Sequence, residues 1–473
     1  MMHRLAGWLL TLLLLWGVAA GCQREKYLTG EEAELLFSLD TLYFDTVFTT
    51  IGSTTRSFRV YNPHTKTVRI DEVRLAGGAS SPFRINVDGA SGPVVRDVEI
   101  LPHDSLYLFV EVTIDPLGGS LPLLVHDSVL FITGGRVADV DLVAWGQDVH
   151  LFDGRIIGTQ RWEADKPYLI VHSIMVDTGA VLTVAPGVIV HNHFGSTFYV
   201  AGTLRIEGTV DEPVIFTGDR LEAMYDDIPG QWSGIYFLNG SSNNRIDHAI
   251  IRNAVYGVHL GNFYAEDPPP DLRITNTVIE HMTWAGISSV GATIDAANCL
   301  VDDCGSYLLS LTTGGDYRFI HCTLANYWSW SPRSTPSVVL SDHYILNDTA
   351  IFTGTLVQAA FYNSIIYGDK EDEFVAVALM QGDTLPFLLD HVLLRKKDVV
   401  NDTVRYHTVF LNHNPGFVSV WENDYHLDSL AFAADRGAWD PALLVPRDME
   451  DRDRLADGHP DLGAYERADT TVR

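Results

Sequence analysis

Six eight-residue segments align with one another without gaps, and their spacing constrains the fold more than any other feature of the sequence. Successive segments start 28, 22, 23, 42 and 28 residues apart. A period of this size fits one coil of a parallel β-solenoid, and the interval of 42 residues has room for one coil with an insertion or for two coils. The segments are 246–253, 274–281, 296–303, 319–326, 361–368 and 389–396.

The third position of every segment is Asn or His. Stacked coils place equivalent residues about 4.8 Å apart, and both side chains carry a hydrogen-bond donor and an acceptor. We therefore predict a structural ladder at this position, in which histidine replaces asparagine and binds no metal. The ladder residues are His248, Asn276, Asn298, His321, Asn363 and His391.

These segments, together with the stretch 229–235 (PGQWSGI), resemble right-handed parallel β-helix proteins of the pectin-lyase-like superfamily. The stretches 414–417 (NPGF) and 461–466 (DLGAYE) resemble the closing segment of secreted bacterial β-helix proteins. The resemblance implies a β-helix over 150–425 and a C-terminal closing segment over 426–473. It implies no particular activity, because the superfamily contains lyases, hydrolases and adhesins.

The N-terminus is typical of an exported protein. An apolar run from Leu5 to Ala20 is short for a bilayer span and fits a signal peptide. The run closes on 18–22 (VAAGC), which resembles a bacterial lipobox. The resemblance implies a signal peptide over 1–21, lipidation of Cys22 and a membrane as partner, and the polar stretch 22–37 is predicted to be a tether. We expect a cell-envelope lipoprotein of the outer membrane, on either its periplasmic or its surface side.

Short alternating runs separated by turn residues fill 38–149 and predict an antiparallel β-sandwich. The pattern Phe58-x-Val60-x-Asn62, with a later Leu101-Pro102 turn, resembles immunoglobulin-like domains of the ASH/hydin type. That resemblance implies a spacer or interaction module. The predicted fold class is therefore all-β, an immunoglobulin-like sandwich followed by a right-handed parallel β-helix.

The charge balance excludes some functions. The chain has 32 basic and 61 acidic residues and a formal net charge of −29, which argues against nucleic acid as a partner because phosphate binding needs clustered Lys and Arg. No lysine occurs between Pro167 and Asp369. A polyuronate would be repelled unless calcium intervened, so the composition favours neutral sugars or cations.

One column of charged residues is the candidate catalytic site. Arg252, Glu280 and Asp302 share the seventh repeat position, and Asp303 follows Asp302. The set resembles calcium-assisted polysaccharide lyases of the superfamily, in which carboxylates hold Ca²⁺ and a basic side chain removes a proton. The alternative, which we favour, is a surface column whose opposite charges pair. Ca²⁺ is expected only under the lyase hypothesis, and no other cofactor is predicted.

Aromatic residues suggest a ligand-binding surface. Tyr327, Trp328 and Trp330 follow a ladder coil, and the two tryptophans would share a face in an extended segment. Exposed rings suit stacking against sugar faces, and Tyr256, Tyr264 and Trp284 lie in or near neighbouring coils. The alternative is that these rings fill a loop or the junction with the tail.

Cysteine and histidine positions give no metal site. Cys299 and Cys322 occupy equivalent positions in the repeat, so either a disulfide or two buried thiols fits. His191 and His193 lie two residues apart on a predicted strand, and two ligands are too few for a metal. We predict that they form an outward surface pair.

The leading hypothesis is a lipid-anchored, non-enzymatic module that binds a glycan or another surface component along the solenoid. The first alternative is a polysaccharide lyase or glycoside hydrolase acting in the β-helix groove. The second is a purely structural partner in envelope assembly. The non-enzymatic hypothesis leads because the sequence contains no recognisable catalytic set and offers an extended scaffold with candidate exposed aromatic residues.

Overall fold

The computed structural model describes residues 27–28, 32–49, 52–53, 55–115, 123–347, 349–398 and 401–467. The predicted signal peptide and Cys22 lie outside these residues. The chain divides into two compact units. The boundary along the chain lies between Asp148 and Val149, one residue before the predicted boundary. Among the described residues, no helix is long and apolar enough to cross a bilayer.

The first unit is a β-sandwich of two five-stranded sheets. Alternate residues of each strand point inward, and Phe58, Phe83, Val110 and Phe131 are among the residues of its core. One sheet has the order β1 (Leu36–Phe37), β3 (Arg56–Tyr61), β8 (Ser105–Val112), β5 (Phe83–Val87) and β6 (Ala90–Gly92). The other has the order β2 (Thr41–Phe48), β10 (Arg136–Gln147), β9 (Leu123–Thr133), β4 (Val68–Leu75) and β7 (Val94–Ile100), and the 3₁₀ turn η2 spans Gly78–Ser80.

The sandwich begins earlier than predicted. Strand β1 pairs with β3, Ala33 is buried in the core, and Leu28 bridges Val68. Residues assigned to the tether therefore belong to the sandwich, because their apolar side chains complete its core.

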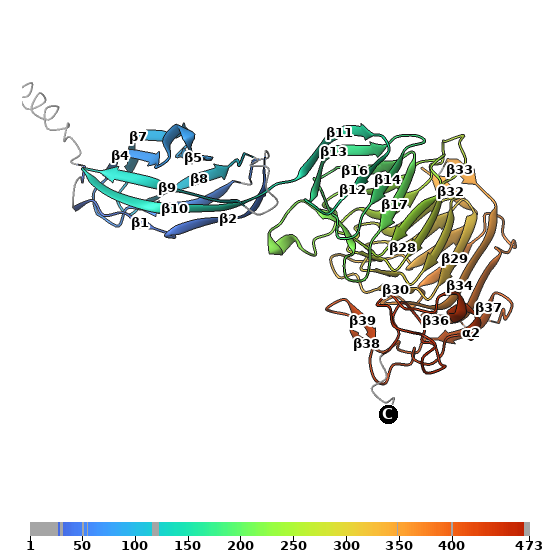
Figure 1. Ribbon diagram of the computed structural model, residues 1–473. Helices are drawn as coiled ribbons and strands as arrows, with labels where there is room; N and C mark the ends of the chain where they lie inside the picture. The colour runs from blue at the N-terminus through green and yellow to red at the C-terminus, as the bar shows by residue number, and fades with distance from the viewer. Residues whose placement is uncertain are drawn as a thin grey trace, which may run out of the picture. The chain divides into compact units, whose positions relative to one another are not determined.

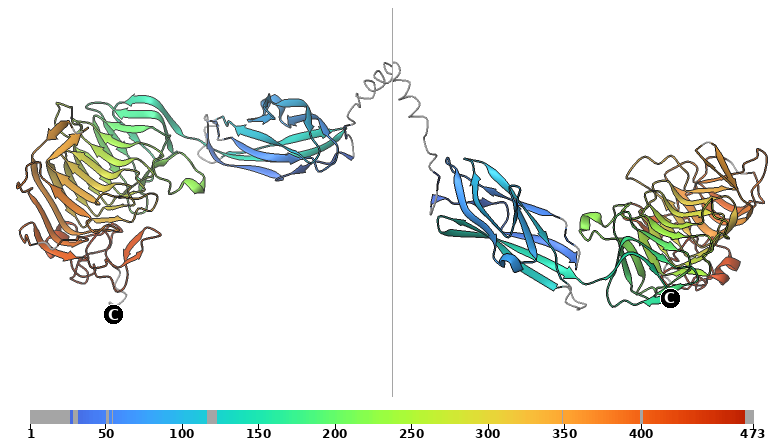
Figure 2. Two further views of the ribbon diagram at one scale, coloured as in Figure 1. Left: turned by 180° about the vertical axis from the view of Figure 1, so that it is seen from behind. Right: turned by 90° about the horizontal axis from the view of Figure 1, so that it is seen from above.

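The second unit is a parallel β-helix built from one 25-stranded sheet (Figure 1). Each coil contributes one short strand to each of three faces, and each strand pairs in parallel with its equivalent in the next coil. Figure 2 shows the same stack from two further sides. The prediction of a β-helix from the repeat is confirmed.

We name the faces A, B and C by their strands. Face A holds β15 (Ile189–Asn192), β18 (Val214–Gly218), β21 (Ala249–Arg252), β24 (Val278–Glu280), β27 (Leu300–Asp302) and β30 (Thr323–Asn326). Face B holds β16 (Thr197–Val200), β19 (Gly234–Phe237), β22 (Tyr256–Leu260), β25 (Ala285–Val290), β28 (Tyr307–Thr312), β31 (Val338–Ser341) and β35 (Phe374–Val377). Face C holds β12 (Gln160–Trp162), β14 (Val181–Val184), β17 (Thr203–Glu207), β20 (Asn244–Asp247), β23 (Asp271–Thr275), β26 (Thr293–Ala297) and β29 (Gly315–Ile320).

Longer strands turn a corner between two faces. These are β11 (His150–Ile157), β13 (Tyr168–Val176), β34 (Leu356–Gly368), β36 (Phe387–Leu394) and β37 (Tyr406–Leu411). Outside the coils lie η3 (Ala223–Tyr225), β32 (His343–Leu346), β33 (Ala350–Thr353), β38 (Phe417–Ser419), β39 (Asp424–Leu427) and α2 (Trp439–Leu444). Strand β39 spans the predicted 425/426 boundary, so the closing segment starts earlier, after β37.

The 42-residue interval holds one coil with an insertion. Strand β29 pairs directly with β34 in the next coil, and β32 and β33 form an antiparallel hairpin between them.

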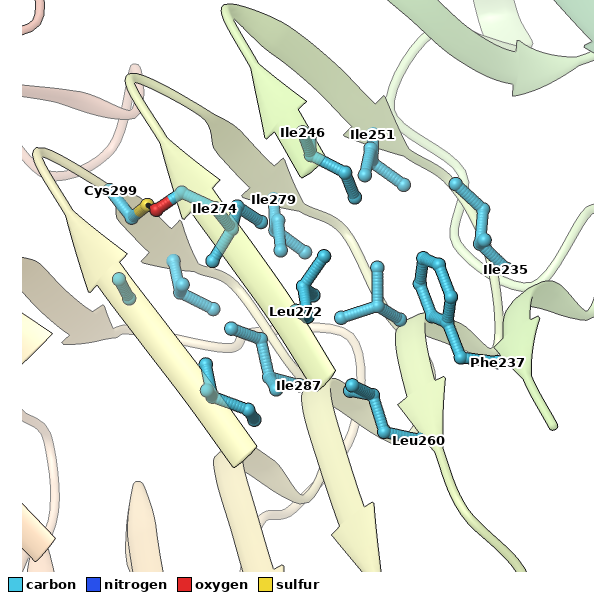
Figure 3. Packing of buried hydrophobic residues seen from close by; sticks show 14 of the residues in the cluster. Ile235, Phe237, Ile246, Ile251, Leu260, Leu272, Ile274, Ile279, Ile287 and Cys299 are labelled. Atoms are coloured by element: carbon cyan, nitrogen blue, oxygen red, sulfur yellow. Dashed lines mark hydrogen bonds between the residues drawn. The ribbon is translucent and has the colours of Figure 1, made fainter. Parts of the chain in front are cut away.

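The interior of the coils is a continuous apolar stack. Ile246 and Ile274 lie one above the other on β20 and β23, Ile251 and Ile279 face them from β21 and β24, and Cys299 lies beside Ile274 (Figure 3). Each inward residue buries its side chain against equivalents in neighbouring coils, which is the main stabilising contribution expected for a solenoid.

The predicted ladder residues all lie at one turn, between faces C and A, and all have the left-handed backbone conformation. Their φ angles run from 47° for Asn363 to 53° for His391. Asn is among the few residues that adopt this region readily, so the backbone bend explains the residue type as much as side-chain bonding does. Asn298 Nδ2 donates to Asn276 Oδ1 at 2.9 Å, and Asn363 Nδ2 lies 3.0 Å from His321 Nε2.

Candidate functional site: an uncharged aromatic face

Face B differs from the other two faces in charge. Its seven strands contain no Asp, Glu, Lys or Arg, although the chain carries a net charge of −29. Arg205, Arg245 and Arg273 lie on face C, whereas Arg252 and Glu280 lie on face A. These seven strands therefore form an uncharged stretch of the solenoid wall.

A row of aromatic side chains follows this wall through five successive coils. The ring centroids are 5.8 Å apart for Tyr199–Tyr236, 5.7 Å for Tyr236–Tyr256, 5.0 Å for Tyr256–Trp284 and 5.4 Å for Trp284–Tyr307. All five side chains are half-buried, so each keeps part of its ring in contact with solvent. We call these residues the aromatic row.

The inserted hairpin brings a second group of rings to the row. Tyr344 of β32 stacks on Phe263, with centroids 4.6 Å apart. Burial raises the pKa of Tyr256 and of Tyr307, and the neighbouring Tyr344 raises the pKa of both further. Tyr344 thus lies near two members of the row, and the insertion that lengthens the repeat contributes to this surface.

His259 is the titratable imidazole of face B. Its ring lies 4.9 Å from that of Tyr236 and 5.4 Å from that of Tyr256, and its Nδ1 is 3.1 Å from Ser288 Oγ. Burial lowers its pKa to about 4, and a backbone hydrogen bond with Gly261 opposes this shift. The imidazole is therefore neutral at physiological pH.

The sequence-predicted catalytic column is assembled, but its Asp302 is covered. Arg252 pairs in register with Glu280, and Glu280 is followed in the next coil by Asp302. Asp302 is 0% exposed, and neither of its carboxylate oxygens has a hydrogen-bond partner among the described residues. Burial raises the pKa of Asp302 well above its usual value, and Glu280 and Asp303 raise it further.

The closing segment supplies the cover. Tyr425 and Met449 pack with Leu300 and Ala325 over face A, and Tyr465 borders the same cluster. Asp303 is buried and lies 3.7 Å from His281, whose Nε2 contacts Asn423 at 2.9 Å. A polymer would reach Asp302 only after this segment moved.

The closing segment also binds the ladder. Asn298 donates to the Arg447 carbonyl at 2.7 Å and accepts from Arg454 at 2.9 Å. Asn363 and Ala438 exchange two hydrogen bonds of 2.8 and 2.7 Å. Arg454 is fully buried, and it pairs with Glu466 at 3.2 Å.

The aromatic residues predicted after the ladder coil do not form one exposed surface. Trp328 is buried, its indole N–H donates to Ser331, and Tyr327 stacks on Tyr425 of the closing segment. Trp330 is 53% exposed. The prediction that Trp328 and Trp330 share an exposed face is wrong, because Trp328 turns inward against the preceding coil at Gly305.

The expected surface pair of histidines is also wrong. His191 is buried and bonds the Gly218 carbonyl, whereas His193 follows β15 and pairs with Asp219. Cys299, Cys304 and Cys322 are buried free thiols. Across the described ranges, no group of three His, Cys, Asp or Glu side chains is placed to hold a metal.

Tyr199, Tyr236 and Tyr307 were missed by the sequence analysis. Two of them precede the first eight-residue repeat, and all three lie on strands of face B, which the repeat does not cover. Extending the alignment to the third strand of each coil would have placed Tyr199 in register with Tyr236, and Tyr307 in the same column as Tyr256.

One comparison with known proteins supports the fold. A family model described as a pectate-lyase-like beta helix domain matches residues 154–262. This match fits the parallel β-helix. No curated protein matches the chain.

Two solved structures resemble parts of the chain weakly. The Escherichia coli chaperone DraB is 13% identical over 24% of this chain and 54% of its own, with a TM-score of 0.18. A family 123 glycoside hydrolase from Clostridium perfringens is 8% identical over 27% of this chain and 26% of its own, also with a TM-score of 0.18. The chain thus spans about half and about a quarter of these two proteins, and at such scores neither supports an argument.

Proposed function

We propose that the protein is a non-enzymatic glycan-binding protein of the cell envelope and that the aromatic row of face B is its binding surface. The observation that carries the proposal is the continuous run of partly exposed aromatic side chains through five coils. Aromatic rings combine apolar faces with polar edges and so suit stacking on sugar rings. The pectate-lyase-like match agrees with a carbohydrate-related role.

The proposal also covers localisation. The signal peptide and Cys22 would place the chain in the envelope, and the sandwich would hold the β-helix away from the lipid. A lipid-anchored binding module needs no catalytic set, and Asp302 in the charged column of face A is covered by the C-terminal segment.

The first prediction tests the row itself. Replacing Trp284→Ala in the detergent-solubilised full chain removes the ring between Tyr256 and Tyr307, and we expect oligosaccharide affinity to fall by about tenfold or more. Isothermal titration with cellohexaose, xylohexaose, mannohexaose and hexagalacturonate measures this. Trp330→Ala is the matched control, since that exposed ring lies outside the row. The proposal fails if none of the four sugars binds, or if both variants weaken binding equally.

A further inference from the structure

The hydroxyl groups of the aromatic row are free for a ligand. Tyr199, Tyr236, Tyr256 and Tyr307 are held by ring contacts, and their phenol oxygens make no hydrogen bond to any residue that the structure describes. By contrast, the buried phenol of Tyr317 lies 2.9 Å from Ser289 Oγ and donates to the Gly314 carbonyl. The row thus combines exposed ring surface with unused donors and acceptors.

These groups stay uncharged over a wide pH range. Burial raises the pKa of Tyr236, Tyr256 and Tyr307, and neighbouring tyrosines raise it further: Tyr256 and Tyr199 for Tyr236, and Tyr344 for the other two. The titratable groups whose rings touch His259 are Tyr236 and Tyr256. No carboxylate, ammonium or guanidinium group contributes to any of these shifts.

Charge beyond the face disfavours an anionic ligand. A polyuronate approaching this protein meets a net charge of −29 and no Lys or Arg on the strands of face B. Binding carboxylates normally requires Arg or Lys within hydrogen-bond distance. A neutral sugar is not repelled by the negative charge and needs no Arg or Lys. Its hydroxyl groups can form hydrogen bonds with phenol hydroxyls as they do with water.

We propose that face B selects an uncharged glycan, which stacks on the aromatic row and hydrogen-bonds the phenol hydroxyls of Tyr236, Tyr256 and Tyr307 without any charged contact. This inference rests on the proposed function and adds the ligand class and the groups that recognise it. It also separates this face from a site for the acidic polysaccharides on which pectate lyases act.

The test removes hydroxyls and keeps rings. We expect the double variant Tyr236→Phe, Tyr307→Phe to bind the preferred neutral hexasaccharide about tenfold more weakly, because two hydrogen bonds to the sugar are lost. Tyr43→Phe is the matched control, an exposed tyrosine of the sandwich. The wild-type dissociation constant should change less than about twofold between about pH 5.5 and 8.5 and between about 50 and 500 mM NaCl.

The outcomes separate the two proposals. Hexagalacturonate binding as tightly as the neutral sugars, a dissociation constant that rises about tenfold with salt, or full affinity in the double variant would overturn the inference. If any of these results is found but Trp284→Ala still weakens sugar binding by about tenfold or more, the proposed function stands. If no sugar binds at all, both are rejected.

Discussion

At the scale of single residues, Asp302 is the most unusual group of the β-helix. It is fully buried, its carboxylate oxygens have no hydrogen-bond partner among the described residues, and it lies near Glu280, Asp303, Tyr425 and Tyr465. An ionised carboxylate in such a place is strongly disfavoured, so the folded state holds the carboxyl in its neutral form. The stability of the closing segment should therefore depend on pH through Asp302.

The sign of this linkage follows from the direction of the shift. The pKa of Asp302 is higher in the folded than in the unfolded chain, so the folded chain retains a proton that the unfolded chain releases. The stabilising contribution is fully present below the unfolded pKa of about 4 and is lost as the pH rises towards the folded pKa. Burial also raises the pKa of Asp461 to about 6 and of Glu466 to about 8, and these groups act in the same direction.

We therefore expect Asp302→Asn to make the closing segment more stable at neutral pH and to weaken its pH dependence. The loss of one linked proton removes a slope of at most about 1.4 kcal/mol per pH unit from the free energy of opening. Hydrogen exchange of the β39 amides between about pH 5 and 8 measures that free energy. Asp295→Asn is the control, because Asp295 is partly exposed and paired with Arg318. An unchanged slope in Asp302→Asn would show that Asp302 is not the linked group.

At the scale of elements, the turn between faces C and A is held by backbone conformation and by side-chain bonds together. Asn298 has φ 52° and bonds Asn276, the Arg447 carbonyl and Arg454. Asn347, in the inserted hairpin, has nearly the same φ of 51° but is exposed. Comparing substitutions at Asn298 and Asn347 therefore separates the contribution of the backbone conformation from that of the side-chain hydrogen bonds.

We expect Asn298→Ala to lower the free energy of unfolding by about 3–5 kcal/mol, because it strains the left-handed backbone and leaves Arg454 with a lost partner. Asn347→Ala should lower the free energy of unfolding only by the cost of placing alanine in the left-handed conformation, about 1–2 kcal/mol. Thermal and urea unfolding of the two variants compare them. Equal losses would mean that the bonds to the closing segment contribute nothing.

At the scale of the whole molecule, the repeat predicted the β-helix because it depends on local features, a short strand followed by a residue that tolerates positive φ. The site was less predictable, because exposure of an outward side chain depends on distant residues. Asp302 and Tyr327 looked like surface groups, yet Tyr425, Met449 and Tyr465 cover this part of face A. Face B remained open, and its tyrosines lie outside the segments in which the repeat is visible.

Attachment to the membrane is also a property of the whole chain. We expect Cys22→Ser to move the protein from the membrane fraction to the soluble fraction, because acylation at this thiol would be its anchor. Fractionation of cells and intact mass measurement of the purified chain test this. A wild-type mass without acyl groups, or a variant that stays with the membrane, would contradict the lipoprotein assignment.

The bonds between the ladder and the closing segment also set an order of events during synthesis. Asn298 can form its hydrogen bonds to Arg447 and Arg454 only after a further 149 and 156 residues have been made. Asn363 can bond Ala438 only after a further 75 residues. The coils emerge first and can stack as they appear. The bonds that fasten them form only once residues 438–454 have been made, so the β-helix reaches its full resistance to unfolding only after this segment has followed the coils.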